Sequence, residues 1–264
     1  MHTKILLLVG ITSLSFLGCG SNTAPTNIPS MTMAKISGTV PGTRIEAFCE
    51  GGTYVQVSST QNGSKQHPFE IELPQHTNCR LVMTTNENNP ETRIITLIGF
   101  TKDATSGTTI SLSEDIDLSY IPLMLDYNLI YDTNRDHVQD RLLYVRLSNN
   151  NRASINNISV FDANNNNRID VYEDTSGDSI VSAYEDDDND GIANTYDDDN
   201  KNNKPDYIED DDNDGKINHK DDDNHNGTPD YLDDDDNDGK VNHLDNDDTN
   251  DDEDDDDYDD DRDN

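Results

Sequence analysis

The chain has 264 residues and a formal net charge of −38, from 56 acidic and 18 basic residues. The charge is unevenly spread, because 42 acidic and 7 basic residues fall in 162–264, which leaves 14 acidic and 11 basic residues before that segment. This asymmetry predicts two electrostatically different modules. Nucleic acid and anionic lipid are excluded as expected partners of the acidic module, because like charges repel.

The N-terminus has the pattern of an export signal, which we expect to span 1–18. Lys4 precedes an apolar run from Ile5 to Leu17 that is too short for a membrane span. The residues FLGC followed by GSN resemble the lipobox of bacterial lipoproteins, although Phe16 stands where leucine is usual. The resemblance implies that Cys19 is lipidated and begins the mature chain. An ordinary secretory signal with a chance cysteine is the alternative.

The same resemblance implies a place in the cell envelope. Gly rather than Asp follows Cys19, which implies an outer membrane lipoprotein, with exposure at the cell surface left open. A lipid anchor would leave no transmembrane helix in the mature protein. Residues 19–34 are small, polar and proline-containing, so we expect a flexible tether there. Cys49 and Cys79 then remain, and an exported compartment allows them to form a disulfide, although two buried free thiols are the alternative.

Residues 35–120 alternate between short apolar runs and turn clusters, which predicts a small β-sandwich. Seven runs are expected to be strands: KISGTV, RIEAFCE, TYVQVSS, FEIELP, RLVMTT, RIITLIGF and TTISLS. Their spacing resembles the carboxypeptidase-regulatory-like sandwich, which implies a structural or binding module without catalysis. The predicted fold class is therefore mainly β, with a small β-sandwich followed by an irregular, helix-poor array of calcium-loop repeats.

Residues 121–161 form a connecting region whose fold the sequence leaves undecided. The runs RLLYVRL and SINNISVF fit either a further hairpin or short helices. The stretch IYDTNRDHVQD carries Asp132, Asn134, Asp136 and Asp140 and looks like a degenerate first copy of the repeat that follows, with His137 where glycine is expected.

A 12-residue repeat occupies 162–245, with aspartate at position 1 of seven units: Asp162, Asp174, Asp186, Asp198, Asp210, Asp222 and Asp234. Positions 3 and 5 always carry an oxygen-bearing side chain. Position 6 is Gly or Asn in six of the seven units, which predicts a positive φ there. Position 8 is apolar throughout, and position 11 is mostly Tyr or Leu.

Oxygen ligands at alternate positions before a sharp turn are what calcium requires, since it takes six to eight oxygens. The sequence therefore predicts several calcium ions bound by positions 1, 3, 5, 9 and 12. The candidate ligands are Asp162, Asn164, Asn166, Asp170, Glu173, Asp174, Ser176, Asp178, Glu185, Asp186, Asp188, Asp190, Asn194, Asp197, Asp198, Asn200, Asn202, Asp206, Glu209, Asp210, Asp212, Asp214, Asn218, Asp221, Asp222, Asn224, Asn226, Asp230, Asp233, Asp234, Asp236, Asp238, Asn242 and Asp245.

The units DDDNDGKINHKD and DDNHNGTPDYLD resemble the thrombospondin type 3 repeat, in which loops wind around calcium ions with little hydrophobic core. This chain lacks the disulfides of the animal repeats. A weaker likeness, in DTSGDSIVSAYE, is to dockerin loops, but units that abut every 12 residues leave no room for the helices of dockerins or EF-hands.

Composition alone also fits a disordered acidic chain, and we expect that state for the tail 246–264. His219, His225 and His243 fall within the units, but oxygen-rich loops disfavour zinc or nickel. No catalytic motif such as GxSxG or HExxH is present, so no enzyme activity is expected.

The expected function is that of a lipid-anchored spacer, adhesin or scaffold, with a surface protein or polysaccharide as partner. Alternatives are a low-affinity calcium buffer or mineral-surface binder and, less favoured, an accessory subunit of a surface enzyme. A spacer must be stiff when loaded with calcium, whereas a buffer need only bind the ion.

Overall fold

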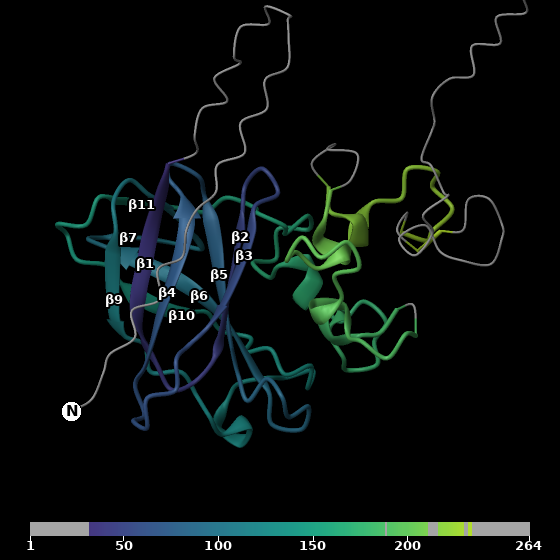
Figure 1. Ribbon diagram of the computed structural model, residues 1–264, viewed down its shortest axis with the longest axis horizontal. Helices are drawn as coiled ribbons and strands as arrows, with labels where there is room; N and C mark the ends of the chain where they lie inside the picture. The colour runs from purple at the N-terminus through teal and green to yellow at the C-terminus, as the bar shows by residue number, and fades with distance from the viewer. Residues whose placement is uncertain (1–31, 188, 211–215, 230–231, 234–264) are drawn as a thin grey trace, which may run out of the picture. The chain divides into compact units, whose positions relative to one another are not determined.

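The computed structural model describes residues 32–187, 189–210, 216–229 and 232–233, and its strands form two sheets (Figure 1). The strands are β1 (Met33–Val40), β2 (Arg44–Cys49), β3 (Tyr54–Ser58), β4 (His67–Pro74), β5 (Cys79–Thr85), β6 (Ile94–Lys102), β7 (Thr105–Gly107), β8 (Thr109–Leu112), β9 (Ile116–Tyr120), β10 (Leu143–Arg146) and β11 (Ala153–Asn156). The helices are short 3₁₀ turns: η1 (Tyr127–Leu129), η2 (Asp170–Tyr172), η3 (Ser182–Tyr184), η4 (Asn194–Tyr196), η5 (Asp206–Ile208) and η6 (Asn218–Lys220). A mainly β, helix-poor fold is thereby confirmed.

The seven runs predicted as strands each contain one, and β7 and β9 were not predicted. The smaller sheet has the order β4-β1-β9, in which β1 pairs antiparallel with β4 and parallel with β9. The larger sheet follows the order β10-β6-β5-β2-β3, with β7 beside β6, and with β8 pairing both β5 and β11. Together the two sheets form a β-sandwich-like domain.

The two sheets differ in how many faces they bury. In β1 and β4 buried and more exposed residues alternate, as expected for a sheet with one face toward the core. Every residue of β2 and β5 is buried, so both faces of the larger sheet are covered. Both strands also bury charged side chains, Arg44 and Glu46 in β2 and Arg80 in β5, so neither strand reads as a continuous apolar run.

Each face of the larger sheet contributes to a different apolar cluster. The inner cluster lies between the sheets and contains Ile36, Ile71, Ala47, Leu81 and Met83, among others. The outer cluster begins with the alternate residues of the same strands and continues into the repeats. Its buried members are Phe48, Val82, Ile95, Leu97, Val138, Val160, Ile169, Val171, Tyr172, Val181, Ala183, Tyr207, Ile208 and Ile217. Apolar residues of the repeats thus cover the outer face of the larger sheet.

The undecided segment 121–161 contributes strands to the larger sheet. β10 pairs parallel with β6, and β11 pairs antiparallel with β8. A disulfide joins Cys49 in β2 to Cys79 in β5, two residues that are paired across the neighbouring strands. This is one of the two alternatives that the sequence left open for the pair.

Several sequence-based expectations concern residues that the structure does not describe. They are the signal peptide at 1–18, the lipidated Cys19, most of the tether at 19–34 and the acidic tail at 246–264. Within the described ranges, no helix has the length and apolar character needed to cross a membrane.

Candidate metal centre

The helices of the repeat region follow the 12-residue register, since η2 to η6 begin at residues 170, 182, 194, 206 and 218. Each begins at position 9 of its unit, just after the apolar residue at position 8. The backbone N–H of position 9 donates to the carbonyl of the residue just before its own unit, over 2.7 Å from Asp170 to Phe161 and 2.6 Å from Asn218 to Glu209. The same bond recurs from Ser182 to Glu173, from Asn194 to Glu185 and from Asp206 to Asp197. A repeated backbone bond therefore links each of the second to fifth units to its predecessor.

The aspartate at position 1 organises each loop. In the first unit, Asp162 Oδ1 accepts from the N–H of Asn166 and Oδ2 accepts from the N–H of Asn167, both over 3.0 Å. The equivalent carboxylates of Asp174, Asp198 and Asp222 accept from the same positions of their units. The backbone therefore curls around the position-1 carboxylate, which satisfies donors that would otherwise lack a partner.

The sharp turn predicted at position 6 is confirmed where the structure describes its φ. The values are 73° at Asn167, 75° at Ser179, 95° at Gly191, 71° at Asn203 and 95° at Gly227. Position 4 is also left-handed, which the sequence analysis missed: Asn165, Gly177, Asn189, Lys201 and His225 all have positive φ. Five of the seven units carry Asn or Gly at position 4, and this pattern could have predicted the positive φ.

Side chains at positions 3, 5 and 12 meet in the units that carry Asn at positions 3 and 5. The Nδ2 of Asn164 lies 2.9 Å from Glu173 Oε1, and the Nδ2 of Asn224 lies 2.7 Å from Asp233 Oδ2. Asn200 makes the same contact with Glu209. The position-5 residues Asn166, Asn202 and Asn226 also donate to these position-12 carboxylates. Three of the predicted ligand positions are therefore gathered at one point.

The second and third units place several carboxylates close together. Burial raises the pKa of Glu185 at position 12; a hydrogen bond from Ser176 opposes this, and Asp187, Asp178 and Asp174 raise the pKa further. In the next unit, the buried Oδ1 of Asp186 has no hydrogen-bond partner among the residues that the structure describes. A cation bound within these loops would stabilise both groups.

Position 9 does not face positions 3, 5 and 12 but faces position 2 of its own unit. Asp206 Oδ2 accepts from the N–H of Asp199 over 3.0 Å, and Asp170 accepts from the N–H of Ala163 over 3.2 Å. Asn194 accepts from the N–H of Asp187 in the same way. Sequence reasoning placed position 9 in the loop centre, because the direction of its side chain depends on the 3₁₀ turn that begins there.

A second group of oxygens lies at the junction between units. Carboxylate oxygens of Asp197, Asp199 and Asp206 all lie within 4.8 Å of one another, and no other group of three qualifies in the described ranges. These residues occupy position 12 of one unit and positions 2 and 9 of the next. Asp199 was not a predicted ligand. The sequence could have indicated it, because position 2 is acidic in the last five units: Asp187, Asp199, Asp211, Asp223 and Asp235.

A protein cation lies at a later junction of the same kind. The ammonium of Lys216 lies 2.5 Å from Asp221 Oδ1 and 3.3 Å from Asp223 Oδ1, which occupy positions 12 and 2. Carboxylate and amide oxygens are the donors that hard cations prefer, whereas zinc, nickel and copper favour nitrogen or sulfur. Both kinds of oxygen group therefore suit calcium better than a transition metal.

A buried polar contact, here called the Glu46 seam, joins the sandwich to the repeats. The Glu46 carboxylate is 1% exposed and accepts hydrogen bonds from the hydroxyls of Tyr54 in β3 and Tyr172 in the first unit. It also lies 3.0 Å from Arg44, whose guanidinium donates to the Thr195 carbonyl of the third unit. Burial, and then the charge of Glu46, raise the pKa of Tyr172 well above its ordinary value. The seam includes Arg44, Glu46, Tyr54, Tyr172 and Thr195.

A second arginine of the sandwich reaches the first repeat. Arg80 in β5 lies 3.2 Å from Asp162 Oδ2 and donates to the Asn167 carbonyl over 2.6 Å. Burial lowers the pKa of Arg80, and attraction to Asp162 opposes this effect. The position-1 carboxylate of the first unit is therefore compensated by the sandwich.

The remaining predicted ligands lie outside the described residues: Asp188, Asp212, Asp214, Asp230, Asp234, Asp236, Asp238, Asn242 and Asp245. No protein-family model matches the chain, and no curated protein matches it.

Proposed function

We propose that residues 162–245 bind several calcium ions and that the protein is a non-enzymatic structural component of the cell envelope. The observation that carries this proposal is the recurrent loop, in which a position-1 carboxylate holds the backbone turn while the oxygen-bearing side chains of positions 3, 5 and 12 lie together, with the Asn amides donating to the position-12 carboxylate. The likeness of the units to thrombospondin type 3 repeats points to the same cation.

Bound calcium would reduce the repulsion between the carboxylates of the array. The 42 acidic residues of 162–264 face only 7 basic ones, and several divalent ions would offset much of that excess. Because such loops rarely exist preformed in an unfolded chain, the free energy of binding becomes free energy of folding. Calcium sites of extracellular modules have dissociation constants of about 10⁻⁴ to 10⁻³ M. The sites would therefore fill in calcium-rich surroundings and empty in chelator.

Packing favours a structural role over a calcium buffer. Ile169, Val181 and Ile217, all at position 8, are buried in the outer cluster with Phe48 and Val82 of the sandwich. A buffer needs no such contact, whereas a spacer or scaffold requires that its modules hold a fixed relation. The proposed role is accordingly a calcium-stiffened spacer, adhesin or scaffold, and its partner would be a surface protein or polysaccharide.

Calorimetric titration of the full chain with calcium, and separately with magnesium, tests the proposal. We expect saturable binding of several calcium ions and weaker binding of magnesium. Asp186→Asn should reduce calcium binding, because it removes charge from a position-1 carboxylate with a buried, unpartnered oxygen. Asp103→Asn is the matched control, since this exposed residue lies in the turn between β6 and β7. Equal binding of both cations would contradict a calcium-specific role.

We propose attachment to the outer membrane through a lipid on Cys19, on the strength of the FLGC sequence and the apolar run before it. In cells, the wild-type chain should fractionate with membranes and carry the mass of an attached lipid. Cys19→Ser should abolish both properties, and Cys49→Ser, which leaves the lipobox intact, is the control. A wild-type chain that is released without lipid would support the ordinary secretory signal instead.

A further inference from the structure

The segment from Asp132 to Leu143, which precedes the repeats, folds as the repeat loops do. It keeps oxygen-bearing residues at positions 1, 3, 5 and 9 but has neither Gly nor Asn at position 6. Asp132 Oδ1 accepts from the N–H of Arg135 over 2.7 Å, and Oδ2 accepts from the N–H of His137 over 3.0 Å. In the second repeat unit, Asp174 accepts from the N–H groups three and five residues later, at Gly177 and Ser179. The two loops therefore share their organising hydrogen bonds.

The likeness extends through the rest of the loop. Arg135 and His137, at positions 4 and 6, have φ of 69° and 67°, in the left-handed region that the repeats use at the same positions. Asp140 at position 9 accepts from the N–H of Thr133 at position 2 over 3.0 Å, as Asp206 does from Asp199. Position 12, however, is Leu143, so the acid that closes the repeat loops is missing.

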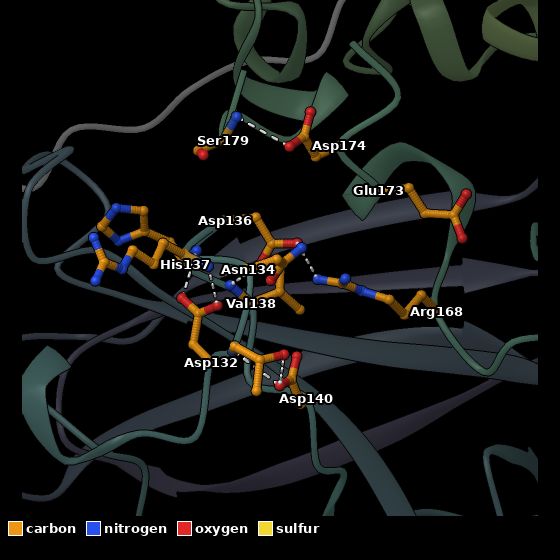
Figure 2. A network of polar contacts seen from close by, with 12 residues as sticks. Asp132, Asn134, Asp136, His137, Val138, Asp140, Arg168, Glu173, Asp174 and Ser179 are labelled. Carbon is orange, nitrogen blue, oxygen red and sulfur yellow. Dashed lines mark hydrogen bonds and ion pairs between the residues drawn. The ribbon is translucent and has the colours of Figure 1, made fainter. Parts of the chain in front are cut away.

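A guanidinium contacts the oxygens at the centre of this loop. Arg168 Nη2 lies 2.6 Å from Asp136 Oδ2, which also accepts from the amide of Asn134 over 2.8 Å (Figure 2). The Asp136 side chain is 0% exposed, and its other oxygen accepts from the N–H of Val138. Both oxygens of this buried carboxylate are therefore satisfied by protein donors, one of them a full positive charge.

The loop is also attached to the sandwich. Ile95 in β6 donates its N–H to the His137 carbonyl over 2.9 Å and forms a parallel bridge with Val138. The His137 ring stacks on Tyr127, with 4.3 Å between ring centroids, and its Nδ1 lies 2.9 Å from the Arg93 carbonyl. Arg168, which belongs to the first repeat unit, thus reaches a loop that is fixed to β6.

We propose that Arg168 is the built-in cation of loop 132–143. A loop with this fold needs positive charge near positions 3 and 5, and a single guanidinium suffices where position 12 carries no acid. The loop accordingly takes no calcium, remains closed when calcium is removed, and holds the first repeat unit on the sandwich. The statement that calcium is the cation of the later loops rests on the proposed function. The closure of loop 132–143 by Arg168 does not depend on it.

Hydrogen exchange of the full chain, measured in chelator and in calcium, tests this assignment at the N–H groups of residues 135, 137 and 138. In chelator the wild-type loop should stay protected, and Arg168→Met should exchange about tenfold faster or more, because a buried carboxylate loses its partner. Arg168→Lys, which keeps the charge, should retain most of the protection. Arg135→Met is the matched control, since Arg135 is exposed in the same loop, and it should behave as wild type.

Calcium should restore protection to Arg168→Met, since the ion can then enter a loop from which the guanidinium has gone. The assignment is overturned if the wild-type loop loses protection in chelator, if Arg168→Met exchanges like Arg135→Met, or if calcium leaves Arg168→Met unprotected. The proposed function has its own readout at residues 174–187. If that proposal is wrong, the protection of these residues from hydrogen exchange will not respond to calcium in the wild-type chain.

Discussion

The sandwich and the repeat array are held together by different physical means. In β2 and β5 every residue is buried, and a disulfide joins the two strands. A repeat unit, by contrast, has one three-residue helix, and its backbone is organised by hydrogen bonds to a single carboxylate. Burial of apolar surface needs no ligand, whereas gathered carboxylates need a cation. The comparison teaches that one chain can place a module built on apolar burial beside one built on hydrogen bonds to carboxylates.

The two regions are nevertheless coupled. The outer face of the larger sheet is covered by Ile169, Val181 and Tyr207 of the repeats, and the Glu46 seam joins both regions by buried polar contacts. The array therefore gains from the sandwich the apolar surface that its own short units cannot supply.

Removal of calcium should have the largest effect on stability, and it should destabilise the repeats but not the sandwich. A ligand at about 100 times its dissociation constant stabilises a folded state by about 2.7 kcal/mol per site, and this contribution is lost in chelator. We expect the N–H groups of Ser179, Asn202 and Asn203, which donate to position-1 carboxylates, to lose their protection from hydrogen exchange. Those of β2 and β5 should keep it. Equal behaviour of both regions would contradict the comparison.

Glu46→Ala should have the next largest effect, because it breaks the seam from the side of the sandwich. Arg44 would be left buried without its partner carboxylate, and such a loss costs about 3–5 kcal/mol in the free energy of unfolding. Urea denaturation in calcium measures this change. Glu70→Ala is the control, since its ion pair with Lys35 is exposed to solvent and contributes little to stability.

Calcium titration of the same variant sharpens the result. Tyr172 of the first unit loses its acceptor in Glu46→Ala, so calcium should bind the variant more weakly than the wild-type chain. Unchanged calcium affinity would mean that the array folds without help from the sandwich.

Local features of both regions could be predicted from the sequence. The seven strand runs and the left-handed position 6 follow from period-two alternation and from the recurrence of Gly and Asn, which are properties of neighbouring residues.

Long-range contacts could not be predicted in this way. Arg80 meets Asp162 across 82 residues, and Tyr172 meets Glu46 across 126. No local pattern relates such partners, because they are brought together only when the repeats pack on the sheet. The direction of the position-9 side chain was missed for a different reason, since it depends on the 3₁₀ turn that begins at that position.

Replacing Cys49 and Cys79 together by alanine should destabilise the sandwich without removing the calcium sites. The two cysteines are 30 residues apart, and loss of a cross-link over such a loop lowers the free energy of unfolding by about 3–4 kcal/mol in the chain-entropy account. Denaturation followed at the strands measures this effect, and calcium titration under native conditions should give the wild-type number of ions. A reduced number would show that the loops depend on the sheet even while it is folded.

The smallest expected effect concerns position 6. Two opposite substitutions there test the left-handed turn of the array alone. Ser179 has a φ of 75° and is exposed, so Ser179→Gly removes about 1 kcal/mol of backbone strain and loses no packing. Gly191 has a φ of 95° and no atom within 4 Å of an added Cβ, so Gly191→Ser should impose a similar cost without a clash. We expect the calcium concentration that protects each unit from hydrogen exchange to fall about fivefold in the first variant and to rise about fivefold in the second. Ser179 is exposed and Gly191 has no side chain, so a change in sandwich stability would show that backbone strain is transmitted through the Glu46 seam. If the required calcium concentration shifts in the same direction in both variants, a common left-handed turn is contradicted.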